Sequence, residues 1–263
     1  MQKKQTNLLK DDLCGKVVLV TGGGSGIGAA IAEAFGAQGA RVGIHYHGTD
    51  DQSVAGLIER IRLTGGDAFP LQADFRSSQA VSDTIEQVSA HFGRLDILIN
   101  NAGSMVDRRP LEEVDNDFID QVFDLNARSV TTACRAALPI FTRQKRGCII
   151  NVSSISARTG GSPGSSIYSA AKAFVSTLTR SLARELADRQ IRVNAISPGT
   201  IETAFHERFS SREKLEKTRA GIPLQRLGEA ADCVGTALYL ACDDLSGYVT
   251  GQVIEVNGGQ LMA

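Results

Sequence analysis

Short apolar runs alternate with longer amphipathic segments along nearly the whole chain. Seven runs predict strands: Val17–Thr21, Arg41–Tyr46, Ala68–Ala73, Leu95–Asn100, Cys148–Ser153, Arg192–Ser197 and Gln252–Val256. Most are continuously apolar, which is typical of strands covered on both faces. The segments between them are long enough for crossover helices: 27–38, 51–64, 78–92, 115–142, 167–189 and 229–241. This alternation predicts a doubly wound α/β fold, with one parallel sheet of about seven strands and helices on both faces.

Composition and charge narrow the class of protein further. The chain has 263 residues, of which 42% are hydrophobic and 22% charged, with a net charge of −1. Such a chain favours a well-packed globule with no general attraction to nucleic acid or to an anionic membrane. No apolar run approaches the ~20 residues of a membrane helix, so we expect neither partner. We expect residues 1–12 to form a flexible polar lead-in without a secretory signal, and 13–263 to form a single domain.

The cysteines and histidines argue against metal and disulfide sites. The five cysteines lie at positions 14, 134, 148, 233 and 242, with no C-x-x-C pair. An odd number without paired spacing favours buried free thiols in a reducing compartment, so we expect a cytoplasmic protein. His45 and His47 lack an evident third ligand, so we expect no metal.

A glycine-rich turn follows the first predicted strand. It reads Thr21-Gly22-Gly23-Gly24-Ser25-Gly26-Ile27-Gly28, and a helix-like segment comes next. Glycines allow backbone N–H groups to approach a diphosphate, and the helix N-terminus adds positive potential. A purely structural turn is the alternative, but the strand before and the helix after favour a dinucleotide site. The G-x-G-x-x-G/A fingerprint fits only loosely, through Gly24, Gly26 and Ala29, whereas the spacing Thr21-Gly22-x-x-x-Gly26-x-Gly28 fits without strain.

Further motifs follow in a fixed order, each at a predicted strand end or helix. They are Asn100-Asn101-Ala102-Gly103, Asn126, Asn151-Val152-Ser153-Ser154, Tyr168-Ser169-Ala170-Ala171-Lys172 and Ser197-Pro198-Gly199-Thr200-Ile201-Glu202-Thr203. From about Gly15 to the C-terminus the chain resembles the short-chain dehydrogenase/reductase family, in its compact single-domain branch. The resemblance implies a Rossmann-type domain and an enzyme that interconverts a secondary alcohol and a ketone with a nicotinamide cofactor.

Tyr168 and Lys172 are four residues apart, so they share a helix face. Taken alone, the pair would most simply be a surface contact. The resemblance implies that Tyr168 is the acid/base and that Lys172 also holds the ribose of the cofactor. A free phenol has a pKa of about 10, and an ammonium ~4 Å away in a partly shielded site would lower it by ~3 units. We therefore expect Lys172 to make Tyr168 more acidic.

The resemblance adds Ser154 and Asn126 as the other catalytic candidates. Ser154 would polarise the substrate oxygen. The interval from Ser154 to Tyr168 is one residue longer than the commonest family pattern, which indicates an insertion and leaves Ser153, Ser156 and Ser165 as competitors. Asn126 would keep its helix irregular enough to hold a water that links Lys172 to solvent.

The resemblance also implies a set of cofactor-binding residues. They are Gly22, Gly24, Ser25, Gly26, Ile27, Gly28, Tyr46, His47, Asp74, Asn100, Ala102, Gly103, Tyr168, Lys172, Pro198, Gly199, Ile201 and Thr203. No acidic residue ends the second predicted strand, where Tyr46 stands, and this absence favours NADP over NAD. The glycine turn has Ser25 and no arginine, and Asp50 and Asp51 follow downstream, so NAD stays the alternative.

The substrate is less well defined by the sequence. Residues 203–224 are charged and read most simply as a solvated helix, but the resemblance implies a substrate-covering segment, with Gly160–Gly164 as another wall. The overall pattern is most similar to 3-oxoacyl-carrier-protein reductases and to sugar or polyol dehydrogenases, and the long helices imply a homotetramer. A dinucleotide-sensing protein without catalysis is the rival, as is a methyltransferase, in which the pair of Tyr168 and Lys172 would have no role.

Overall fold

The computed structural model describes residues 8–262 of the chain. The strands are β1 (Val17–Val20), β2 (Arg41–Tyr46), β3 (Asp67–Gln72), β4 (Ile97–Asn100), β5 (Gly147–Val152), β6 (Ile191–Pro198), β7 (Ile201–Glu202), β8 (Gly228–Glu229) and β9 (Val253–Val256). The α-helices are α1 (Leu8–Leu13), α2 (Gly26–Ala37), α3 (Asp51–Leu63), α4 (Ser78–Phe92), α5 (Asn116–Phe123), α6 (Ser129–Gln144), α7 (Ser156–Thr159), α8 (Ser166–Leu186), α9 (Ala204–Phe209), α10 (Arg212–Gly221), α11 (Val234–Ala241) and α12 (Asp243–Ser246). Four further turns are 3₁₀ or π: η1 (Leu111–Glu113), η2 (Asp124–Arg128), η3 (Ala187–Arg189) and η4 (Ala230–Cys233).

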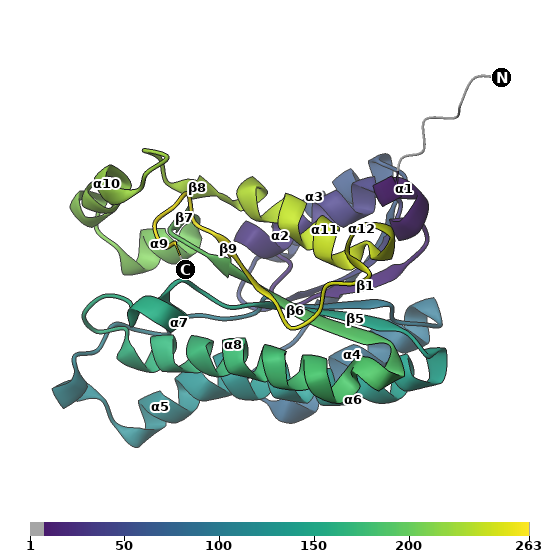
Figure 1. Cartoon of the computed structure of the whole chain (residues 1–263), viewed down its shortest axis with the longest axis horizontal. Coiled ribbons are helices and arrows are strands. Elements are labelled where there is room, and N and C mark those ends of the chain that lie inside the picture. Colours follow the sequence, from purple (N-terminus) through teal and green to yellow (C-terminus); the bar gives the residue numbers. More distant parts are fainter. Residues whose placement is uncertain (1–7, 263) are drawn as a thin grey trace.

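The seven predicted strands form one parallel sheet, in the order β3-β2-β1-β4-β5-β6-β9. The chain starts in the middle of the sheet, winds outward to β3, and then crosses over to β4. Figure 1 shows α4, α5, α6 and α8 on one side of the sheet, with α2, α3 and α11 on the other. The prediction of a doubly wound α/β domain is therefore confirmed.

Two apolar cores explain why the strands read as continuous hydrophobic runs. Every residue of β1, β4 and β5 is buried. One core joins alternate strand residues to α2, α3 and α11, and the other joins the remaining ones to α4, α6 and α8. Side chains of successive strand residues point to opposite faces, so both must be apolar when helices cover both faces.

The carboxyl ends of the strands carry additional short elements, of which the sequence predicted only a helix within residues 203–224. Residues Ile201–Glu202 and Gly228–Glu229 pair as a separate two-stranded sheet. The segment between them holds α9 and α10, which lie at the end of the molecule where β6 and β9 terminate (Figure 1). No residue of α10 is buried, as expected for its charged sequence.

The predicted helix over 115–142 is interrupted by a π-helical turn, η2, between α5 and α6. A π-turn inserts one extra residue into a helix and often occurs at functional sites. The periodicity of apolar residues could not show this insertion, because each half is regular by itself.

Residues 8–12, which we assigned to a flexible lead-in, form most of α1. Asp12 bonds Lys16 at 2.7 Å and accepts the backbone N–H of Asp243 at 2.6 Å. Residues 1–7 lie outside the described part of the chain. None of the described helices is long and apolar enough to cross a membrane.

Candidate active site

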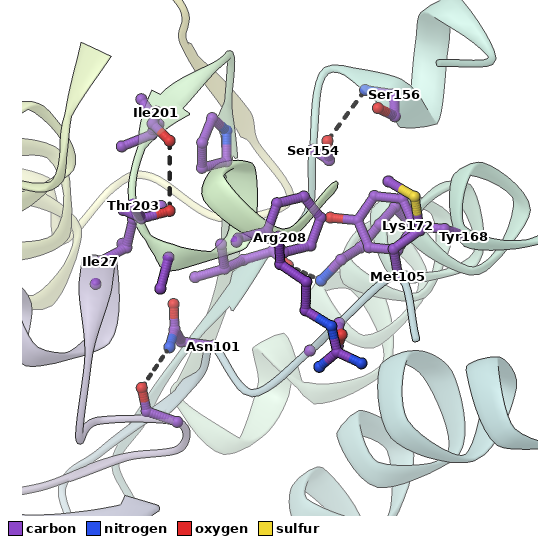
Figure 2. A pocket seen from close by; sticks show the side chains of 18 of the residues that line it. Ile27, Asn101, Met105, Ser154, Ser156, Tyr168, Lys172, Ile201, Thr203 and Arg208 are labelled. Atoms are coloured by element: carbon purple, nitrogen blue, oxygen red, sulfur yellow. Dashed lines mark hydrogen bonds between the residues drawn. The ribbon is translucent and has the colours of Figure 1, made fainter. Parts of the chain in front are cut away.

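A cleft of about 970 Å³ opens at the carboxyl ends of the strands. One half lies against the glycine turn and the ends of β2 and β3. The other half lies between the loops after β4 and β5 and the helices α9 and α10. Figure 2 shows Tyr168 and Lys172 in this pocket, with Ser154, Met105 and Arg208 around them. A cleft at this edge of an open parallel sheet is where such folds bind ligands.

The glycine turn has a shape that only glycine permits. Gly22 and Gly26 have φ values of 61° and 53°. A Cβ on Gly28 would lie 2.1 Å from the carbonyl oxygen of Gly22, so α2 packs directly on the turn. Asn101 holds the same turn from the neighbouring loop, because its Nδ2 donates to the carbonyls of Thr21 and Gly22 at 2.9 and 3.0 Å. Figure 2 shows Asn101 facing this turn.

His45 supports the glycine turn from below. Its Nδ1 accepts the backbone N–H of Gly22 at 3.1 Å, so its Nε2 carries the proton and donates to Ala73 O at 3.0 Å. The ring stacks on Phe75 with centroids 3.6 Å apart. Burial lowers the pKa of His45 to about 4, so the imidazole is neutral at pH 7. The sequence suggested His45 only as a metal ligand, because Gly22 and His45 are far apart in the chain and meet only in the fold.

The far end of this half is lined by Tyr46, His47, Asp74 and Arg76. Arg76 binds the carboxylate of Asp74 through two hydrogen bonds, in which Nε and Nη2 donate to Oδ2 at 3.0 and 2.6 Å. These hydrogen bonds lower the pKa of Asp74 to about 2. The only acidic side chain among the described lining residues is thus paired with a cation.

Asp50 and Asp51, which kept NAD as the alternative to NADP in the sequence analysis, do not line the cleft. Asp51 accepts the hydroxyl of Tyr46 at 2.8 Å. Asp50 caps α3 and accepts the backbone N–H of Ser53 at 2.8 Å. Both carboxylates are therefore engaged outside the pocket.

Tyr168 and Lys172 lie together on α8 at the centre of the cleft, and both are buried. The Nζ of Lys172 donates to Val152 O at 2.8 Å and lies 5.8 Å from the centroid of the Tyr168 ring. Burial raises the pKa of Tyr168 to about 12, against the opposing effect of a hydrogen bond with Ser154. Burial also lowers the pKa of Lys172 to about 8. Burial thus moves the pKa of Tyr168 in the direction opposite to the one that we expected from Lys172.

The four competing serines have different partners. The hydroxyl of Ser153 donates to Lys172 O at 3.0 Å and contacts Ser176, so it is used in packing α8 on β5. Ser165 donates to Ser162 O at 2.6 Å within its own loop. Only Ser154 hydrogen-bonds Tyr168, while its Oγ accepts the backbone N–H of Ser156 at 3.1 Å (Figure 2). The geometry favours Ser154.

Asn126 lies in the π-turn η2 and is fully buried. Its Nδ2 donates to Ser104 O at 2.7 Å and to Val122 O at 2.8 Å. A Cβ on Gly103 would lie 2.7 Å from Asn126 Oδ1 and 3.1 Å from Lys172 Nζ. Asn126 is therefore packed behind Lys172, in the kind of irregular helix that the resemblance implies.

Most of the predicted cofactor residues line the cleft, and two do not. Lining residues are Gly22, Gly24, Ser25, Gly26, Ile27, Tyr46, His47, Asp74, Ala102, Gly103, Tyr168, Lys172, Pro198, Gly199, Ile201 and Thr203. Gly28 is buried under the turn. Asn100 is buried between β4 and β5, where its Nδ2 donates to Asn151 Oδ1 at 2.9 Å, and its neighbour Asn101 lines the cleft instead. Strand side chains alternate between faces, and a shift of one residue reverses the direction.

Comparisons with known proteins identify the family of this chain. A family model described as Enoyl-(Acyl carrier protein) reductase matches residues 22–260. The chain belongs to the short-chain dehydrogenase/reductase family, whose named members here are reductases and dehydrogenases, and it is an NAD(P)-dependent oxidoreductase.

Particular relatives extend this class in several directions. The chain is 39% identical to the 3-oxoacyl-[acyl-carrier-protein] reductase FabG of Staphylococcus aureus, over 94% of this chain and 98% of that protein. It is also 39% identical to 3beta-hydroxysteroid dehydrogenase 1 of Eggerthella lenta, over 96% of each. Among solved structures, a putative NAD(P) dependent gluconate 5-dehydrogenase from Beutenbergia cavernae with bound NADP has a TM-score of 0.88 and 34% identity, over 96% and 99% of the two chains. An NADH-dependent reductase A1-R' complexed with NAD has a TM-score of 0.86 and 33% identity, over 97% and 100%.

Proposed function

We propose that this protein is an NADP(H)-dependent reductase of ketones, with Tyr168 as the proton donor. The observation that carries the proposal is the meeting of Ser154, Tyr168 and Lys172 where the two halves of the cleft join. Two elements far apart in sequence, the loop after β5 and helix α8, place these side chains beside a turn suited to a dinucleotide.

The residues present fit a nicotinamide dinucleotide. A Cβ on Gly22 or Gly24 would approach Ala102 Cα at 3.0 Å or Tyr46 Cβ at 2.9 Å, so the turn packs closely on its neighbours while both glycines line the cleft. The start of α2 would hold the diphosphate, and Lys172 would hold the ribose. A bound cofactor supplies or accepts a hydride at C4 of its nicotinamide ring.

The choice of NADP rests on charge at the far end of the cleft. Asp50 and Asp51 are engaged elsewhere, and Asp74 is neutralised by Arg76. His47 and Arg76 line the same end. A ribose 2′-phosphate would therefore meet cationic and neutral groups there, with no free carboxylate to repel it.

In the proposed reaction, a ketone, NADPH and a proton become a secondary alcohol and NADP⁺. The hydroxyl of Ser154 donates a hydrogen bond to the carbonyl oxygen, and Tyr168 gives its proton to the same oxygen. A phenol with a pKa of about 12 still holds its proton at pH 7, which suits the reductive direction. Asn126 and Gly103 keep Lys172 in place behind the phenol.

Tyr168→Phe tests the proposal. This variant keeps the ring but loses the proton, so turnover of ketones should fall about a hundred- to ten-thousandfold while NADPH binding, followed by fluorescence titration, is retained. Tyr248→Phe is the control, because Tyr248 is fully exposed. A Tyr168→Phe variant with ordinary activity would overturn the assignment. Binding of NADPH by the wild type without turnover of any ketone would favour the rival hypothesis of a dinucleotide-sensing protein without catalysis.

The substrate, assembly and location are further parts of the proposal. Similarity to 3-oxoacyl-carrier-protein reductases and to a gluconate dehydrogenase supports assays with 3-oxoacyl thioesters and with oxidised sugars. A homotetramer through α6 and α8 is supported by the exposed Phe174 on α8, and light scattering in solution tests it. The five free thiols support a cytoplasmic location.

A further inference from the structure

Three cationic side chains line the half of the cleft that lies between the loops after β4 and β5 and the helices α9 and α10. We call this part the substrate half. Arg108 comes from the loop after β4, Arg208 from α9 and Lys214 from α10. Figure 2 shows the side chain of Arg208 extending into the pocket. Three separate segments therefore bring positive charge to one place, which a single charged helix face would not do.

Hydrogen bonds hold two of these cations close together. Lys214 Nζ donates to Ser162 Oγ at 2.9 Å, and Arg108 Nη1 lies 3.5 Å from the same oxygen. Arg108 also donates to the carbonyls of Phe209 and Pro163 at 2.6 and 3.1 Å. Burial lowers the pKa of Lys214, and the nearby charge of Arg108 lowers it further, as expected for a partly buried cation close to a like charge.

Among the side chains that the structure describes, no acidic group forms an ion pair with any of these three cations. The neighbouring Arg109, by contrast, pairs with Asp107 and Asp115. The acidic side chain described in the cleft, Asp74, lies at the opposite end and is held by Arg76. Hydroxyl and carbonyl oxygens accept hydrogen bonds from these cations but do not cancel their charge. The cations therefore repel one another, and a bound anion would relieve that repulsion.

A row of aromatic rings connects this cluster to the reacting phenol. Tyr168 and Phe205 have ring centroids 5.7 Å apart, and Phe205 and Phe209 have centroids 5.0 Å apart. Arg208 lies over the Phe209 ring at 5.1 Å, and Arg108 bonds the backbone of Phe209. A substrate with a short apolar carbon chain would therefore reach from this cluster to the hydroxyl of Tyr168.

We infer that the ketone reduced by this protein carries an oxyanion, a carboxylate or a phosphate, several carbon atoms from its carbonyl, and that Arg108, Arg208 and Lys214 bind that group. The inference rests on the proposed function, since it concerns the other end of the same substrate. Arginine matches a planar carboxylate with two parallel hydrogen bonds, and the lysine adds a compact charge. The aromatic row covers the carbon chain between the two ends.

The test uses methyl ketones with a carboxylate two to five carbons from the carbonyl, from 4-oxopentanoate to 7-oxooctanoate. Each is assayed with NADPH beside its neutral methyl ester, and 5-oxohexyl phosphate serves as the phosphate arm. At the preferred length, kcat/KM for the acid should exceed that for its ester about ten- to a hundredfold. A better phosphate ester than acid would assign the site to phosphate, within the same inference.

Variants of the cluster test whether these cations cause the preference for the acid over its methyl ester. Lys214→Gln and Arg208→Gln should each reduce the ratio of kcat/KM for the acid to that for its methyl ester about tenfold, through a higher KM for the acid. Lys217→Gln is the matched control, because Lys217 is exposed on the same helix and lies outside the cleft. Arg208→Lys should recover part of the preference, and added salt should weaken it.

The outcomes separate this inference from the proposed function. Equal reduction of acids and esters would overturn the anion site and leave the reductase intact. If no ketone is reduced, calorimetric binding of the same acids to the NADP⁺-loaded protein decides. Binding of acids but not esters, weakened by Lys214→Gln, would keep the anion site and refute the reductase, and no binding would refute both.

Discussion

The two halves of the cleft are built in different ways. The half of the cleft against the glycine turn, which we call the dinucleotide half, is centred on backbone. The buried His45 and the half-buried Asn101 fix this backbone through hydrogen bonds that end on the glycine turn. The substrate half is made of side chains on short helices, and α10 buries no residue at all. The first half is held in place by the core, whereas the second depends on contacts among its own polar groups.

This difference separates what the family shares from what is particular to this chain. A diphosphate and a ribose are the same in every reaction, so a fixed cradle serves them. A substrate differs from one enzyme to the next, and side chains on exposed helices can change without disturbing the sheet. Each of the following experiments perturbs one half and asks whether the other responds.

The largest effect is expected from replacing a glycine in the dinucleotide half, with a glycine of α10 as the control. Gly28→Ala places a Cβ 2.1 Å from Gly22 O and 2.5 Å from Asn101 Nδ2, so the turn must move. NADPH affinity should fall more than about a hundredfold, as measured by fluorescence, with a lower melting temperature. Gly221→Ala, at the end of α10, meets nothing within 4 Å and should leave both unchanged. A normal affinity in Gly28→Ala would show that the turn is adaptable.

His45 should make the stability of the dinucleotide half depend on pH. Burial lowers its pKa to about 4 in the folded protein, from an ordinary value of 6.5, so the unfolded chain takes up the proton first. Its contribution is complete above pH 6.5 and is lost as pH falls towards 4, which amounts to about 3 kcal/mol.

Urea unfolding at pH 7 and at pH 4.5 measures this contribution. The difference in unfolding free energy between wild type and His45→Gln should shrink at the lower pH. His91→Gln, at an exposed position, should show no such change. A constant difference for His45→Gln would contradict the neutral, buried imidazole.

Ser154→Ala should mainly lower kcat, by about a hundredfold, because a hydroxyl that polarises the carbonyl acts mostly in the transition state. Ser165→Ala provides the comparison, since its hydroxyl bonds only within the loop from 162 to 165. Steady-state kinetics with a reducible ketone measure both. Equal losses in the two variants would mean that the loop, and not the Ser154 hydroxyl, matters.

The smallest effect is expected at the far end of the dinucleotide half. Arg76→Gln should weaken NADPH binding about tenfold and spare NADH, because the freed Asp74 would repel a 2′-phosphate. Arg60→Gln removes a comparable exposed ion pair with Glu33, outside the cleft, and should change neither. If Arg76→Gln weakens both cofactors alike, the loss does not involve the 2′-phosphate, and the proposed role of this ion pair in favouring NADP is wrong.

The sequence predicted the sheet well because burial on both faces leaves a clear record in apolar runs. Most residues that we expected to bind the cofactor line the cleft, since the glycine spacing and the strand ends are local, and their binding role stays a prediction. Asn100 was chosen where Asn101 lines the cleft, because the point at which β4 ends decides which side chain points outward. His45 and the cluster of Arg108, Arg208 and Lys214 were missed, because each depends on segments that meet only in the folded chain.

The π-turn at Asn126 has a further consequence for the helix that contains it. Phe118 and Val122 before the turn pack near Tyr168, whereas Val130, Ala133 and Phe141 after it pack under the sheet. One additional residue rotates the later part by about 100° relative to the earlier part. Removing Leu125 would give an uninterrupted helix that satisfies one of these two packing surfaces at the expense of the other.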